Sequence, residues 1–139
     1  IIEKRDKIAF GSIVNQGLPF YTGNITYHIP VETKGGNVEM CSSYYVGGMQ
    51  EASIDGGEPV PMIYQPYKVT FTDVKPGQHL IDLKLYGTRQ NGFGPVHLAD
   101  DAEPYQGPRT WRKPGDQWSY EYRLREAGVI VSPRLEEEI

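Results

Sequence analysis

The chain has 139 residues, 38% of them hydrophobic and 23% charged, so it is long enough and apolar enough to form one packed domain. Its net charge of -4 leaves no basic excess for a phosphate backbone, which argues against nucleic acid as the main partner. No stretch approaches the roughly 18 apolar residues of a membrane span, so no membrane partner is expected, and the single cysteine, Cys41, excludes an internal disulfide and a cysteine-based zinc cage.

Turn residues and aromatic residues dominate the composition. Sixteen glycines and eleven prolines are typical of short strands joined by turns. Ten tyrosines and two tryptophans suit pleated sheets. No segment keeps a helical period for ten residues, so the sequence predicts roughly eight strands in an antiparallel sandwich or barrel.

The first half of the chain contains clear strand patterns. Residues 1–9 are charged and form a lead-in segment. Residues 24–31 alternate between apolar and polar side chains and predict a strand. After a turn at 34–37, residues 38–46 predict another strand with Val38, Met40, Tyr44 and Val46 on one face. The sequence "ASIDGG" then predicts a short strand that ends in a hairpin turn at Asp55-Gly56-Gly57.

The second half contains three further apolar patterns. Residues 67–73 and 79–86 predict strands, separated by a turn at Pro76-Gly77. Residues 118–124 alternate again and predict a strand that starts at Trp118. A loop as long as 99–117 is usually functional or poorly ordered. The expected organisation is a lead-in over 1–9, one β-sandwich domain over 10–132, and an acidic tail over 133–139.

The central run resembles a known family. Residues 52–91 are similar to the galactose-binding-like jelly-roll domains attached to bacterial glycoside hydrolases. Matching positions are Ile54-Asp55-Gly56, Pro66-Tyr67, the turn from Lys75 to His79, and Asn91. The flanks "GLPFYTGNITYHIPVE" and "GFGPVHL…WSYEYRLREAGV" extend the resemblance to about residues 17–131.

The resemblance implies an all-β fold, an antiparallel β-sandwich of jelly-roll, galactose-binding-domain-like type. It implies a non-catalytic accessory domain that binds carbohydrate or shapes the substrate site, beside a neighbouring catalytic domain. A purely structural module that packs against that catalytic domain is the alternative. The chain does not start with Met, and we expect a piece of a longer bacterial protein, in the cytoplasm or secreted.

Sugar recognition requires flat aromatic faces and directed polar groups. The candidate carbohydrate-binding residues are Arg89, Asn91, His97, Trp111 and Trp118, with Tyr105, Arg109 and Arg112 on the same long loop. Trp118 has an alternative role as a core residue at the start of a strand. Arg89 and Asn91 have an alternative role in hydrogen bonds to neighbouring loop backbone.

Other polar groups point less clearly to a function. Catalysis within the domain would use carboxylates among Asp100, Asp101, Glu103 and Asp116, but they share one polar loop without an apolar wall. No cofactor is expected, and structural calcium at "LADDAE" or "SIDGGE" is the alternative. His28 and His79 are expected at the surface. The basic residues Arg109, Arg112, Lys113, Arg123 and Arg125 are interpreted as solvated surface, diluted by Asp116 and Glu121.

Overall fold

The computed structural model describes residues 5–100 and 107–138. The fold is all-β, because its regular structure consists almost entirely of antiparallel strands. The helical elements are single turns: η1 (Ile13–Gln16), α1 (Gln90–Phe93), η2 (Thr110–Arg112) and η3 (Gly115–Gln117). No helix within the described ranges is long and apolar enough to cross a membrane.

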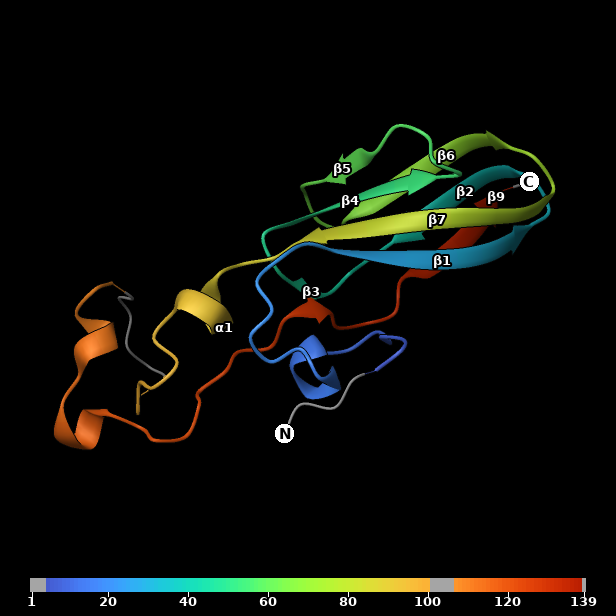
Figure 1. Cartoon of the computed structure of the whole chain (residues 1–139). Helices are drawn as coiled ribbons and strands as arrows, with labels where there is room; N and C mark the ends of the chain where they lie inside the picture. The colour runs from blue at the N-terminus through green and yellow to red at the C-terminus, as the bar shows by residue number, and fades with distance from the viewer. Residues whose placement is uncertain (1–4, 101–106, 139) are drawn as a thin grey trace.

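In the described part of the chain, nine strands form three antiparallel sheets (Figure 1). The four-stranded sheet has the order β1 (Ile25–Thr33), β7 (Gly77–Tyr86), β4 (Met49–Ile54), β5 (Val60–Met62). The three-stranded sheet has the order β6 (Lys68–Val74), β2 (Gly36–Cys41), β9 (Arg134–Glu138). The short strands β3 (Tyr45–Val46) and β8 (Gly128–Val129) pair with each other.

The two larger sheets share one hydrophobic core. The chain crosses between them repeatedly, from β1 to β2 and from β5 to β6 to β7. The inward side chains meet in one cluster of Tyr27, Met40, Ala52, Met62, Val69, Phe71, Ile81, Leu83, Leu85 and Val129. Burial of this apolar surface is the main force that holds the sheets together.

Buried and exposed side chains alternate along the longest strands, as the apolar and polar residues of the sequence predict. In β7, Ile81 and Leu83 are fully buried and Leu85 is almost so, while Asp82 and Lys84 lie on the other face. Successive residues of a strand point to opposite faces, so the apolar set packs on the core. The predicted strands over 24–31, 67–73 and 79–86 are therefore confirmed as β1, β6 and β7.

The strand predicted from Trp118 to Leu124 is wrong. Trp118 forms an isolated bridge with Leu98, and no strand follows before β8. The segment bonds only at intervals to residues 91–98, and its alternating tyrosines have no core to cover. Tyr120 is 93% exposed as a result. Tyr44 also differs from the prediction, because the chain turns after β2 and leaves this side chain half exposed.

The acidic residues near the C-terminus belong to a strand. The sequence sets 133–139 apart as a tail, yet Arg134–Glu138 pairs with β2 as β9. Glu136 lies opposite Glu39 and Glu138 opposite Asn37. Main-chain hydrogen bonds define this edge strand, and its charged side chains stay in solvent, so hydrophobic periodicity gives no signal for it.

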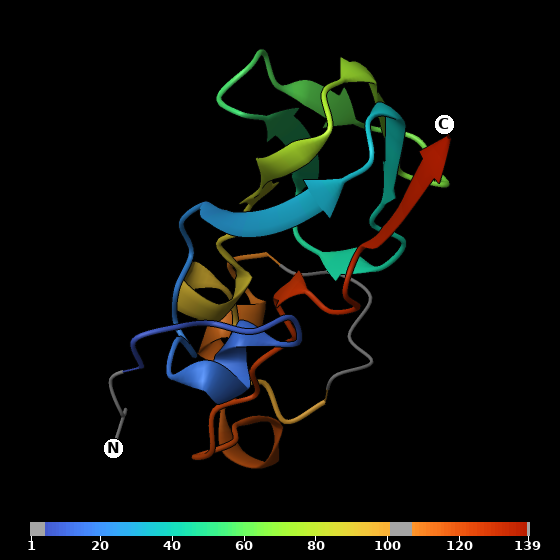
Figure 2. The same cartoon turned by 90° about the vertical axis from the view of Figure 1, so that its right-hand side faces the viewer.

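The irregular segments gather at one end of the sheets. Leu85 pairs with Ile25 and Tyr86 with Met49, so the chain leaves β7 where it enters β1 and β4. Figure 1 shows α1 and the helical turns after it extending beyond this end, with the C-terminus at the opposite end, and in Figure 2 the same segments lie below the sheets. This irregular end carries the predicted site residues.

Candidate functional site

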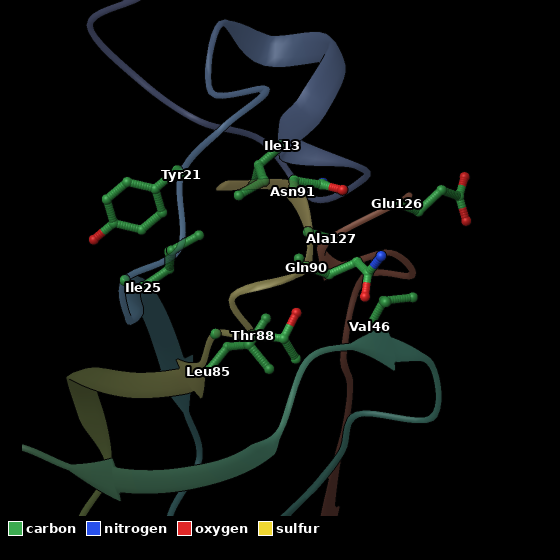
Figure 3. A pocket seen from close by; sticks show the side chains of 13 residues that line it. Ile13, Tyr21, Ile25, Val46, Leu85, Thr88, Gln90, Asn91, Glu126 and Ala127 are labelled. Atoms are coloured by element: carbon green, nitrogen blue, oxygen red, sulfur yellow. The ribbon is translucent and has the colours of Figure 1, made fainter. Parts of the chain in front are cut away.

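A small cavity lies where β7 runs into the irregular end (Figure 3). Its lining comes from separate parts of the chain, including Ile13, Val46, Leu85, Gln90 and Ala127. Its volume is about 20 Å³, which is room for about one water molecule. A sugar ring does not fit there.

Close backbone contacts fix the loop above this cavity. A Cβ atom on Gly87 would lie 2.2 Å from the carbonyl oxygen of Gly23. A Cβ atom on Gly92 would lie 2.5 Å from Cγ2 of Thr22. Glycine at both positions therefore lets residues 87–92 pack directly on the segment that precedes β1.

The side chain of Asn91 anchors this loop through hydrogen bonds to the backbone of Arg125. Its side chain is buried, its Oδ1 accepts from the N–H of Arg125 at 2.9 Å, and its Nδ2 donates to the carbonyl of Arg125 at 2.7 Å. Both functional groups of the amide are thus bonded to backbone, as in the alternative role that the sequence left open. Asn91 holds the 88–94 segment against the backbone of Arg125.

Four rings form an aromatic row, defined here as Phe20, Tyr122, His97 and Trp118. His97 stacks on Trp118 with centroids 4.4 Å apart and lies tilted on Tyr122 at 4.7 Å. Tyr122 in turn meets Phe20 edge to face. Nδ1 of His97 lies 2.9 Å from the carbonyl oxygen of Ser119, and a carbonyl only accepts, so Nδ1 donates this bond.

Trp111 lies beside this row on η2. It is 48% exposed, and Trp118 is 38% exposed. The two indoles line one shallow groove together with His97, Phe93 and Pro95. Trp118 is therefore a surface residue at the groove, and its alternative assignment to the core is wrong.

Trp111 also lines two neighbouring grooves. One contains Arg89, Gln90, Arg125 and Glu126, and the other contains Pro108, Arg109 and Lys113. We call the three grooves around this indole the Trp111 surface. The structure thus brings Arg89, His97, Trp111 and Trp118 together, with Asn91 beneath them.

Sequence reasoning missed several residues of this surface. Phe93 stands in the run "NGFGP", which reads as a turn. Arg125 was assigned to solvated surface. An exposed aromatic residue between two glycines is the one signal that pointed to Phe93.

The carboxylates considered for catalysis or calcium do not converge on these grooves. Asp100 and Asp116 are exposed and line none of the three. Asp101, Glu103 and Tyr105 lie outside the described residues, as does the side chain of Arg112. Within the described ranges, no group of three or more His, Cys, Asp or Glu side chains is arranged to hold a metal ion.

The other two histidines lie on the sheets, away from the Trp111 surface. His28 pairs with Asp82 and its side chain is 66% exposed. The side chain of His79 is only 13% exposed, between Asp55 and the carbonyl of Lys75. His79 is therefore more enclosed than the sequence predicted.

Comparison with known proteins gives partial matches only. No family model matches the chain, and a search of curated proteins finds no match. A solved GH2 beta-galacturonidase from Eisenbergiella tayi, bound to glycerol, is similar to 70% of this chain at 26% identity and a TM-score of 0.46. A GH2 beta-galacturonidase from the same organism, bound to galacturonate, aligns over 70% at 27% identity and a TM-score of 0.45. The aligned part covers only 17% and 18% of those two chains.

Proposed function

We propose that the chain is a non-catalytic, carbohydrate-binding accessory domain of a glycoside hydrolase, built as a β-sandwich of the galactose-binding jelly-roll type. Two antiparallel sheets with one shared core and repeated crossings between them support the sandwich. The similarity of residues 52–91 to such domains supports the jelly-roll type. This resemblance is also the basis for the parent enzyme class.

The observation that carries the binding role is the pair of partly exposed indoles beside His97 on one groove. The face of an aromatic ring is electron-rich and attracts the weakly positive C–H groups of a pyranose. Arg89 and Gln90, in the adjoining groove, supply hydrogen-bond donors for hydroxyl groups. Stacking and directed bonds are thus available on one continuous surface.

The carboxylates of the Trp111 surface support a non-catalytic role. Glycoside hydrolysis uses two carboxyl groups about 5 to 9.5 Å apart. In the described part of the three grooves, Glu126 is the one carboxylate. The surface is suited to binding a sugar, and its described residues do not include a pair of carboxyl groups that could hydrolyse one.

A glycan microarray followed by calorimetry on the isolated chain tests this proposal. We expect binding with dissociation constants between about 1 mM and 1 μM. Trp111→Ala should weaken binding by about 2- to 12-fold, the value of one lost aromatic contact of about 0.5–1.5 kcal/mol. Tyr64→Ala is the control, because Tyr64 is 84% exposed next to β5 and lies on none of the three grooves. If no glycan binds at millimolar concentration, the proposal is wrong.

A second candidate function is packing against a neighbouring catalytic domain. It is favoured by aromatic side chains more exposed than the indoles at the same end: Tyr120 at 93%, Phe93 at 69% and Tyr122 at 57%. Contiguous exposed apolar surface marks an interaction site. Radical footprinting of the longer parent protein distinguishes the two functions, because a packing role requires Tyr120 to be protected there and reactive in the isolated chain.

A further inference from the structure

Cationic side chains surround Trp111. Arg89 and Arg125 line one groove with this indole, and Arg109 and Lys113 line the next. The opposing charge in these grooves, among the described residues, is the single carboxylate of Glu126. Resting on the proposed function, we infer that the bound saccharide is acidic, a pyranose that carries an oxyanion.

The positive charge of these grooves is opposite in sign to the net charge of the whole chain. The net charge is -4, and three of the glutamates lie on β9 with Glu39 beside them, on the outer surface of the three-stranded sheet. The positive charge of the Trp111 surface is therefore a local arrangement and not an average property of the protein. Asp116 and Glu121, which lie close to these cations in the sequence, line none of the three grooves.

The guanidinium groups on this surface are available for a ligand. Arg89, Arg109 and Arg125 are exposed. The ion pairs within the described residues involve other cations, namely His28, Lys68, His79, Lys84 and Arg134. An arginine used only to stabilise the fold would have a carboxylate partner or a backbone carbonyl, and no such bond is found for these three side chains in the part of the chain that is described.

Arginine beside an aromatic ring suits an acidic sugar. A guanidinium group binds a carboxylate or a sulfate through two parallel hydrogen bonds. A uronic acid keeps the C–H faces of the corresponding neutral sugar and replaces its hydroxymethyl group with a carboxylate. Trp111 would then contact the ring while Arg89 and Arg125, in the same groove, bind the anion.

Calorimetry with matched sugars tests this inference. The probes are the trisaccharides of galacturonic acid and of galactose, which differ at C6 alone, with galactose 6-sulfate as the sulfate arm. A second pair, the glucuronic acid and glucose oligosaccharides, tests whether ring stereochemistry matters. We expect an acidic member to bind at least 10-fold more tightly than its neutral partner, with the advantage shrinking between 50 and 300 mM salt as exposed charges are screened. Tighter binding of the uronate than of the sulfate ester would identify the anion as a carboxylate, and the reverse would identify a sulfate.

Two sets of variants separate charge from stacking. Arg89→Gln and Arg125→Gln should each weaken binding of the acidic sugar about 10-fold and leave the neutral sugar unchanged, whereas Trp111→Ala should weaken both. Arg134→Gln, which removes the same charge from β9, should change neither. Equal or tighter binding of the neutral sugars overturns the inference and leaves the proposed function intact. Binding of no saccharide overturns both. Equally tight binding of a single-stranded oligonucleotide also overturns the inference, because it shows general anion binding.

Discussion

The imidazole of His97 lies flat on the indole of Trp118, with ring centroids 4.4 Å apart and planes inclined by 18°. The hydrogen bond from Nδ1 to the carbonyl of Ser119 fixes the imidazole in this orientation. One face of the indole is thereby covered, which limits the orientations that Trp118 can adopt at the groove. His97 is therefore a positioning residue in the proposed binding site, through its contact with Trp118.

His97→Ala should weaken sugar binding about 2- to 12-fold, because the loss of a stacked pair worth about 0.5–1.5 kcal/mol leaves the indole unsupported. His97→Phe should restore most of the affinity, since it keeps the stack and loses only the hydrogen bond. Calorimetry on both variants checks this. Equal losses in the two variants would mean that the bond to Ser119, and not stacking, positions the site.

Asn91→Ala should destabilise the chain by about 1–3 kcal/mol, because it leaves the N–H and the carbonyl of Arg125 without their partner. Asn91→Asp is the sharper variant. Asn91→Asp keeps the acceptor for the N–H and places an oxygen against the carbonyl. At neutral pH it should therefore lower the free energy of unfolding at least as much as Asn91→Ala. Urea unfolding gives the stability, and hydrogen exchange at the Arg125 amide locates the effect. Unchanged protection of that amide would contradict the structural role.

His79 joins two turns at the end of the sheets opposite the Trp111 surface. Its Nδ1 lies 2.5 Å from Oδ2 of Asp55, and its Nε2 donates to the carbonyl of Lys75 at 2.7 Å. The hydrogen bond to Asp55 raises the pKa of His79, and the bond to Lys75 adds to this. The same pair lowers the pKa of Asp55, with a further contribution from the N–H of Leu80.

These two shifts set a pH window for stability. A raised histidine pKa gives a contribution that is complete below the unfolded value of about 6.5 and is lost as pH rises through the folded pKa. A lowered Asp pKa gives a contribution that is present above about 3.9 and is lost as pH falls through the folded pKa. The pair therefore stabilises the fold most between these limits.

His79→Gln should lower the urea midpoint most near pH 5 to 6, and the difference from the native chain should shrink above the folded pKa of His79. His28→Gln is the matched control, because that histidine is 66% exposed and pairs with Asp82 at the surface, an arrangement worth about 0–1 kcal/mol. If the urea midpoint of His79→Gln falls further below that of the native chain between pH 6 and pH 9, this account is contradicted.

Leu83 and Leu80 form a matched pair on β7. Leu83 is completely buried, whereas Leu80 points to the other face and is 41% exposed. Leu83→Ala should lower the free energy of unfolding by about 2–5 kcal/mol, because apolar burial is lost and a cavity is left. Leu80→Ala should cost less than about 1 kcal/mol. Urea denaturation of both variants checks the predicted register, and similar losses in the two would contradict it.

Much of the sheet structure could be predicted from sequence, because β1, β6 and β7 each have one apolar face. The segment from Trp118 to Leu124 has the same alternation, yet no partner strand or core lies beside it. β9 is the opposite case, a strand that the sequence does not predict. Its sequence "RLEEE" has no apolar alternation and pairs through its backbone alone. Periodicity reports burial of side chains, so it misses a strand defined only by its main chain.

The site residues show the same limit. Their types were predictable, because sugars require rings and directed polar groups, and Arg89, His97, Trp111 and Trp118 do line adjoining grooves. The inward role of Asn91 could not be chosen over a ligand-binding role from sequence, because it depends on which distant backbone packs beneath the loop, here that of Arg125.

The two tryptophans give the most direct test, because the chain has no others and both line the groove with His97. In an ¹⁵N-labelled sample, two indole N–H resonances report on the proposed site alone. On addition of an oligosaccharide that the microarray selects, at least one of them should shift in a saturable way while the amides of β9 stay unchanged. Saturable binding that leaves both indole resonances unmoved, or the absence of any shift at millimolar sugar, would contradict carbohydrate binding at the Trp111 surface.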